Sequence, residues 1–177
     1  MNDSIWSQSL ESLYRDLAAP QPAPAGVVAA AVSARFGLAL LIKTLEITGN
    51  RKGFAGDRSR LDAWVETARR ESNTLKQAAD DDISGEPARK RSEIPMNAAQ
   101  AAASGLDVCA EAAEVMEGPL GADLAAAAIL LSSAVQSILL CVDANAGDAG
   151  REERRAMEAR AFTQRDAALH QVSMRLR

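Results

Sequence analysis

Residues 124–142 read LAAAAILLSSAVQSILLCV, and this uncharged run decides the class of fold. It consists mostly of alanine and leucine, which are strong helix formers. Because apolar side chains lie on nearly every face of such a helix, we expect the helix to be buried. Residues 26–47, GVVAAAVSARFGLALLIKTLEI, have the same character and predict a second buried helix. Their small side chains allow neighbouring helices to approach closely, which favours an all-α protein.

The overall composition also favours helices. Hydrophobic residues make up 47% of the 177 residues, but aromatic residues make up only 3%. The core must therefore be built from Ala, Leu, Val and Ile, which suits closely spaced helices better than a β-sandwich. The length fits one domain with a sizeable core, and neither a repeat nor a low-complexity linker interrupts it. We therefore predict a single helical domain over residues 1–177.

Four further helices are predicted from start and stop signals in the sequence. Prolines within residues 20–24 exclude a helix there, because each removes a backbone donor and forces its predecessor into an extended conformation. The complete pattern predicts an up-and-down helical bundle of five to six helices. The expected segments begin at Asp3 or Ser4 and end before Pro20, then cover 26–47, Asp57 or Ser59 to Asp82, Pro95 to Ala113, 122–146, and a charged stretch from Gly150 onward.

The charge distribution argues against a nucleic-acid partner. The chain carries 20 Lys and Arg against 24 Asp and Glu, which gives a formal net charge of -4. Basic residues alternate with acidic ones, as in Arg69-Arg70-Glu71, so no basic stripe is present to release counterions from a polyanion. We therefore expect no nucleic acid to bind.

We also expect no membrane partner and no metal. The run 124–142 is long enough to cross a bilayer, but serines and a glutamine lower its hydropathy and no aromatic belt flanks it. Cys109 and Cys141 lie within apolar helices and no signal segment is recognisable, which predicts a cytoplasmic protein. His170 is the sole histidine, so a structural zinc site is not expected.

Three stretches together resemble one known family. A Pro-Ala-Pro turn at 22–24 leads into an apolar helix that ends near Thr48. The basic loop 51–54, Arg-Lys-Gly-Phe, follows it. Later, Asp123 precedes an alanine-rich helix that ends in Cys-Val-Asp-Ala-Asn at 141–145. This arrangement is similar to the cyclodeaminase/cyclohydrolase family of formiminotransferase-cyclodeaminase and methenyltetrahydrofolate cyclohydrolase, and the chain looks like a divergent, shortened member.

The chain departs from the family pattern at informative positions. Of the three glycines in the family's turn only Gly26 remains, and Val28 stands where the family has serine. Cys141 replaces the first asparagine of a late pair, and the segment between Asp82 and Ile94 is shorter than its counterpart. Valine fills space through which backbone amides would approach a ligand. These losses favour a non-catalytic relative as the alternative to an enzyme.

The resemblance implies folate one-carbon metabolism. Family members act on tetrahydrofolate adducts: a cyclohydrolase adds water to the cationic amidine carbon of methenyltetrahydrofolate, and a cyclodeaminase expels ammonia from formiminotetrahydrofolate as the ring closes. Both reactions need a carboxylate near a developing positive charge, and neither requires a metal or another cofactor. The resemblance therefore implies a hydrolase or a lyase whose substrate is a tetrahydrofolate derivative.

Asp123 and Glu46 are the candidate catalytic acids. Asp123 heads the buried run 124–142 and is the first choice, although an acid at this position also stabilises a helix N-terminus without any catalytic role. Glu46 lies near the end of the other buried helix and could supply a second acid–base group if the two helix ends meet. Its alternative is a solvated residue paired with Lys43, three positions earlier.

Five residues are candidate substrate contacts. Arg51 and Lys52 match the family's basic loop and could hold the carboxylates of a folate's glutamate tail, although basic residues in such loops often serve solubility alone. Asn145 matches a family asparagine and could bond the pterin, or it could cap its helix. Gly26 would admit a ligand close to the backbone. Asp82 could orient the pterin amine.

We further expect a homodimer. Members of the family pair, and two such apolar helices are hard to cover in so small a monomer. The rival to an enzyme is an inactive helical dimer that binds a folate or a protein partner. An enzyme requires an open polar pocket beside the proline-rich bend with Asp123 facing it. In a scaffold, Val27, Val28 and Cys141 would fill that space.

Overall fold

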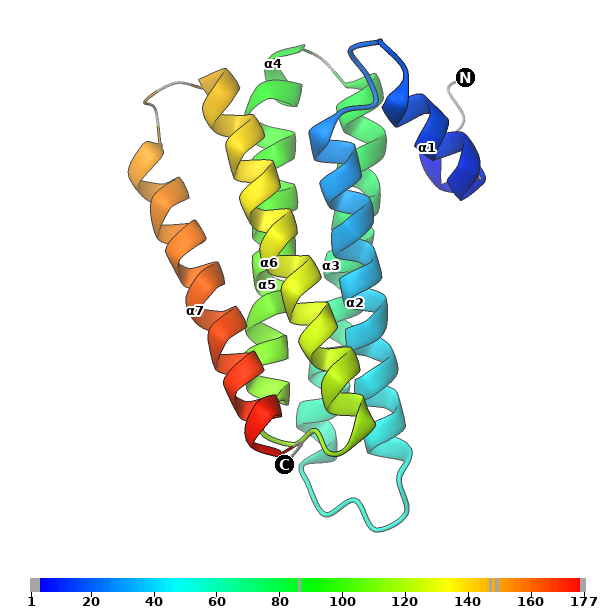
Figure 1. Cartoon of the computed structure of the whole chain (residues 1–177), viewed down its shortest axis with the longest axis vertical. Helices are drawn as coiled ribbons and strands as arrows, with labels where there is room; N and C mark the ends of the chain where they lie inside the picture. The colour runs from blue at the N-terminus through cyan, green and yellow to red at the C-terminus, as the bar shows by residue number, and fades with distance from the viewer. Residues whose placement is uncertain (1–3, 86, 147, 149, 176–177) are drawn as a thin grey trace.

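Two long antiparallel helices, α2 and α6, form the centre of the structure (Figure 1). Helix α2 spans Gly26–Asn50 and helix α6 spans Pro119–Ala146. They contain the two apolar runs of the sequence and extend them by a few residues. Where the structure describes the chain, it consists of helices, turns and loops without a strand. In this computed structural model the described residues are 4–85, 87–146, 148 and 150–175.

Three more long helices complete an up-and-down bundle, which confirms the predicted fold class. Helices α3 and α5 lie behind α2 and α6 in the view of Figure 1, and α7 packs against α6 and α5 on the outside. Two short helices, α1 and α4, lie at the end of the bundle where α2 begins. The bounds are α1 Leu10–Ala18, α3 Arg58–Ser84, α4 Pro87–Arg91, α5 Glu93–Ala112 and α7 Arg151–Arg175.

Aliphatic side chains fill the core, as the composition predicts. Leu38 and Leu45 of α2 are completely or almost completely buried, and so are Leu106 of α5 and Leu131 of α6. Alanines occupy many of the remaining buried positions on the same helices. Small residues bring the helix axes close together, so that leucines from several helices interlock in one continuous cluster.

Gly37 lies at a close approach of the two central helices. A Cβ atom built at Gly37 would lie 3.1 Å from the backbone oxygen of Ala127 and 3.1 Å from Cγ of Leu131, both on α6. A backbone atom cannot move aside as a flexible side chain can. The distance between α2 and α6 therefore depends on the absence of a side chain at this position.

The N-terminal helix is shorter than the sequence predicts. Residues Ile5–Ser7 form a single 3-10 turn, η1, and α1 begins only at Leu10, where Ser9 caps it with its side chain. Of the two expected caps, Asp3 lies outside the described residues, and Ser4 caps η1 by accepting a hydrogen bond from the backbone N–H of Trp6. The hydroxyl of Ser4 also donates a hydrogen bond to the carboxylate of Asp80 on α3 at 2.8 Å. The chain before α1 is thus tied to α3 rather than continued as helix.

Helices α2 and α6 are long and apolar enough to cross a membrane, with mean hydropathies of 1.7 and 2.1. Buried core helices of soluble proteins have the same composition. However, only 44% of the most apolar 18-residue stretch of α2, and 50% of that of α6, is buried. Phe36 and Ile47 of α2 and Ile129 and Leu140 of α6 remain exposed. Each pair is separated by about three turns, so its two members lie on one side of their helix.

We expect Gly37→Val to destabilise the protein by roughly 1–3 kcal/mol, because the added methyl groups must separate α2 from α6 or distort both. Urea unfolding followed by circular dichroism measures the change. Valine has a higher helix propensity than glycine, so a loss of stability must come from the packing. Ala39→Val, at an exposed position on the same helix, is the control for a valine added away from this contact. Equal stability of the two variants would contradict the assigned packing.

Candidate functional site

One end of the bundle is hollowed where α2 begins and α6 ends. The hollow has a volume of about 410 Å³, and its walls come from the proline-rich bend, the last turns of α3 and α6, and helices α4 and α5. Three residues predicted to contact substrate, Gly26, Asp82 and Asn145, meet in this hollow. Lys90 and Arg91 of α4 supply its two cationic side chains.

Gly26 allows the first turn of α2 to contact the last turns of α6. A Cβ atom added at Gly26 would lie 2.9 Å from Sγ of Cys141, which is closer than packed atoms normally approach. Val27 also lines the hollow, whereas Val28 is fully buried in the core. The branched residues near the bend therefore narrow the hollow without filling it.

Asp82 is the carboxyl group of the hollow. Burial raises its pKa above the ordinary value, and the positive charge of Lys90 partly offsets this rise. Lys90 donates a hydrogen bond to the backbone oxygen of Ile83 at 2.8 Å, which holds the ammonium group near the carboxyl group. Burial, together with the negative charge of Asp82, also raises the pKa of the Cys141 thiol. The hollow thus contains an acid that retains its proton more strongly than usual, next to a neutral thiol.

Asn145 lies in the last turn of α6 and lines the hollow. Its side-chain nitrogen donates a hydrogen bond to the backbone oxygen of Cys141, one turn earlier, at 2.7 Å. The position agrees with the predicted contact to a ligand in the hollow, which stays a prediction.

Asp123 lies at the opposite end of the bundle, in the first turns of α6. Its carboxylate accepts a hydrogen bond from Nζ of Lys43 at 2.7 Å, and both side chains are partly exposed. Lys43 follows Gly26 by 17 residues on α2, a distance of about 25 Å. The expectation that Asp123 faces the hollow beside the proline-rich bend is therefore not met within one chain. The antiparallel arrangement places the start of α6 beside the end of α2.

Glu46 lies at the same end as Asp123 but faces another helix. Its carboxylate accepts a hydrogen bond from Arg69 of α3. The alternative pairing of Glu46 with Lys43 is wrong, because each of the two finds a partner across a helix interface instead. The end of α2 and the start of α6 do lie side by side, as the proposed role of Glu46 requires, but the two carboxylates bond to different helices, Asp123 to α2 and Glu46 to α3.

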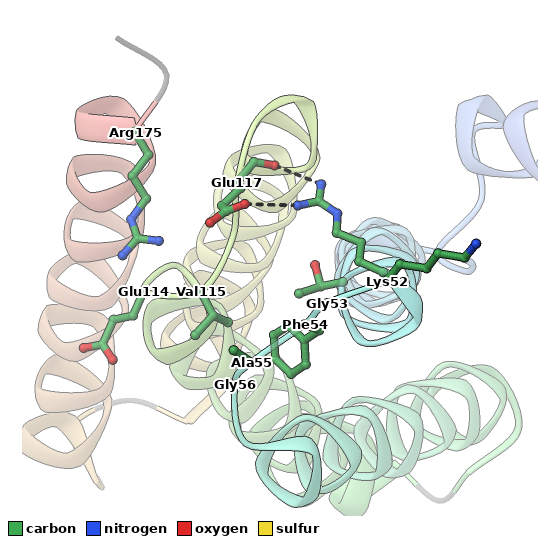
Figure 2. A pocket seen from close by; sticks show the side chains of 11 residues that line it. Lys52, Gly53, Phe54, Ala55, Gly56, Glu114, Val115, Glu117 and Arg175 are labelled. Atoms are coloured by element: carbon green, nitrogen blue, oxygen red, sulfur yellow. Dashed lines mark hydrogen bonds and ion pairs between the residues drawn. The ribbon is translucent and has the colours of Figure 1, made fainter.

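Arg51 and Lys52 line a second hollow of about 410 Å³ at this far end (Figure 2). Arg51 donates hydrogen bonds to a side-chain oxygen and the backbone oxygen of Glu117, each at 3.4 Å. Figure 2 shows Lys52 extending away from the cavity. Nearly the whole length of α2, about 37 Å, separates the two hollows. In a single chain these basic residues therefore cannot hold part of a small ligand bound beside Gly26.

Two cationic residues of the first hollow, Lys90 and Arg91, were not predicted as site residues. They belong to α4, a short helix in a segment that reads as a polar connection. The available signal was the basic run 89–91, which follows the acidic run 80–82 closely enough for the two to meet. Cys141, which the sequence predicts would fill the space beside the bend in a scaffold, is partly exposed and lies against the first turn of α2.

Among the described residues, no group of three or more His, Cys, Asp and Glu side chains is placed to hold a metal ion. Cys109 is fully buried, and burial raises the pKa of its thiol well above the ordinary range. His170 is exposed on α7.

The fold and the hollow define a helical-bundle protein with a polar site beside the start of a central helix. A model of the family described as formiminotransferase-cyclodeaminase matches residues 9–85 and 86–164, so the chain belongs to this family. The crystal structure of formiminotetrahydrofolate cyclodeaminase from Thermotoga maritima has a TM-score of 0.80 to this chain. The match covers 97% of each chain at 17% identity and shows a common fold. No curated protein sequence matches the chain.

We expect Asp82→Asn to raise the melting temperature at neutral pH. Because burial raises the pKa of Asp82, the unfolded chain loses this proton at a lower pH than the folded chain does. Below the ordinary pKa of about 3.9, Asp82 is protonated in both states and the fold bears no cost of ionisation. As the pH rises through the pKa of Asp82 in the folded protein, ionisation of this buried group lowers the stability of the fold. The advantage of the variant should therefore shrink as the pH is lowered toward 4.

Thermal melts between pH 4 and pH 7 test this expectation. Asp62→Asn, at an exposed position on the same helix, is the matched control and should show no comparable change with pH. A lower melting temperature for Asp82→Asn at pH 7 would show that the charged carboxylate stabilises the fold. This result would contradict the raised pKa of Asp82.

Proposed function

We propose that the protein acts on a tetrahydrofolate one-carbon adduct, as a methenyltetrahydrofolate cyclohydrolase or a formiminotetrahydrofolate cyclodeaminase. Membership of the formiminotransferase-cyclodeaminase family supports this type of chemistry. The observation that carries the proposal is the hollow at the start of α2, where Asp82 has a raised pKa close to two cationic side chains. A perturbed acid in a concave polar site is the usual signature of an active site.

Asp82 suits either of two tasks in this hollow. As a carboxylate it accepts hydrogen bonds from the amino group and ring N–H of a pterin. As a carboxylic acid it donates a proton to departing ammonia or relays one from attacking water. A raised pKa lies closer to neutral pH, where proton transfer in both directions is efficient. Lys90 and Arg91 offer positive charge to the carboxylates of the glutamate tail.

The alternative is an inactive relative that binds a folate or a protein partner without turnover. Ala25 and Val27 line the hollow on either side of Gly26, where the family has further glycines. Their side chains restrict how closely a ligand approaches the backbone amides at the start of α2. This observation favours binding without efficient catalysis.

The proposal includes a cytoplasmic homodimer that needs no metal and no additional cofactor. Both cysteines are free thiols, which fits a reducing compartment. The apolar side chains left exposed on α2 and α6 fit a second copy of the chain. In both candidate reactions a nucleophile, either water or the neighbouring ring nitrogen, attacks the amidine carbon, and a C–N bond then breaks. The protons move between nitrogen and oxygen atoms, for which protein acids and water suffice.

We expect purified protein to accelerate the loss of methenyltetrahydrofolate absorbance, or the release of ammonia from formiminotetrahydrofolate. Asp82→Ala should lower the faster of these rates roughly 100-fold or more, because general acid–base groups contribute at least that much. Asp123→Ala tests the first-choice acid in the same assay, and Asp62→Ala is the control for a surface charge.

A wild-type rate equal to the spontaneous rate in both assays would reject the enzymatic proposal. A thermal shift measured with a stable tetrahydrofolate derivative then separates the two remaining cases. A dose-dependent rise in melting temperature that Asp82→Ala removes would support the folate-binding alternative, and the absence of any shift would reject folate recognition altogether.

A further inference from the structure

We propose that residues 9–24 form a strap that opens and closes the hollow beside Gly26 by moving into a second cavity behind it. The strap consists of α1, its cap and the proline-rich bend that leads to α2 (Figure 1). The bend supplies Pro22 and Ala23 to the wall of the hollow. Movement of the strap therefore changes the width of the hollow and the access of a ligand to it.

The chain is firmly attached at both ends of the strap. Before the strap, the backbone N–H of Ile5 donates a hydrogen bond to the carboxylate of Asp80 at 3.1 Å, and Nε1 of Trp6 donates one to the backbone oxygen of Lys76 at 3.0 Å. Ile5 itself is buried in the core. After the strap, Val28 of α2 is completely buried. These two attachments are fixed points between which the strap moves.

The strap itself has few interactions with the rest of the protein. Within the described part of the chain, every hydrogen bond and ion pair of residues 10–24 joins two residues of the strap, as between Arg15 and Glu11. Leu13 is its only buried side chain, and Leu17 packs partly buried against the core. A segment held mainly by one buried leucine opens at a lower free energy than the helices of the core.

A cavity of about 380 Å³ lies behind the strap. Gln8 of the attached end and Ile83 of α3 contribute to its lining, together with side chains of the strap. The bend borders both spaces, because residues 22–23 line the hollow whereas Gln21 and Pro24 line the cavity. The bend is therefore a partition one chain thick. Protein interiors are usually close-packed, and free space on the far side of a wall is what allows that wall to move.

The other walls of the hollow cannot yield in this way. Val27 belongs to α2, whose first turn is packed against Cys141 with no room for a Cβ atom at Gly26. Asp82 belongs to α3, which the core holds through completely buried side chains such as Leu75. The strap is thus the wall that makes room for a ligand wider than the closed hollow. Its closure behind a folate would limit the entry of water, and this consequence alone rests on the proposed function.

Alkylation of Cys141 by iodoacetamide measures the movement without any ligand. Cys141 is partly exposed in the hollow, whereas Cys109 is completely buried in the core. Opening of the strap uncovers only Cys141, but unfolding of the whole domain uncovers both thiols. Digestion after glutamate residues separates the two cysteines for mass spectrometry, because Glu111 and Glu117 lie between them.

We expect Leu13→Ala to accelerate the alkylation of Cys141 roughly 10-fold or more at constant pH, because it removes the buried side chain that holds the strap closed. Leu10→Ala is the matched control, since Leu10 lies on the same helix but is 68% exposed, and it should react as the wild type does. Cys109 should stay unmodified in all three proteins. Equal rates for the two variants, or modification of Cys109 in parallel with Cys141, would overturn the proposal.

Gln8→Trp tests the proposal in the opposite direction. Gln8 lies in the attached part of the chain, so a larger side chain there occupies the space into which the strap moves. We expect alkylation of Cys141 to slow roughly threefold or more, and Gln171→Trp, at an exposed position on α7, to cause no change. An unchanged or faster rate in Gln8→Trp would contradict the movement. If the strap behaves as expected but no folate reaction or binding is found, only the proposed function fails.

Discussion

The close packing of α2 against α6 is the constraint on which the rest of the structure depends. Gly37 leaves no side chain between its own backbone and the carbonyl group of Ala127, so the two most apolar helices of the chain lie in direct contact. The other long helices pack against this pair, and Phe36, Ile47, Ile129 and Leu140 of the pair remain exposed. The hollow between the start of α2 and the end of α6 follows from this packing.

Antiparallel pairing gives each end of the bundle its own chemistry. At one end, Gly26 lets α2 contact Cys141. Asp82 of α3 and the basic side chains Lys90 and Arg91 of α4 line the hollow beside this contact. At the other end, Lys43 and Asp123 join the same two helices through an exposed ion pair, which adds little to stability. Exposed charges of this kind are free to interact with a ligand or a second chain.

The sequence predicts the bundle well because its signals are local. Apolar composition, prolines at 20–24 and capping residues such as Asp57 determine where helices begin and end, and the five long helices begin within a few residues of the predicted positions. The first helix is the exception, because it begins only at Leu10. The candidate site is predicted less well, because it depends on which helix ends meet. Asp123 was expected beside Gly26 from the family pattern alone, and the basic contribution of α4 has no periodic signal.

A crystal structure of the protein with a bound, stable tetrahydrofolate derivative tests the central claim most directly, namely that the hollow beside Gly26 recognises a folate. The account predicts the pterin ring in this hollow, within hydrogen-bond distance of the Asp82 carboxyl group. A folate bound elsewhere on the molecule, with this hollow empty, would contradict the account.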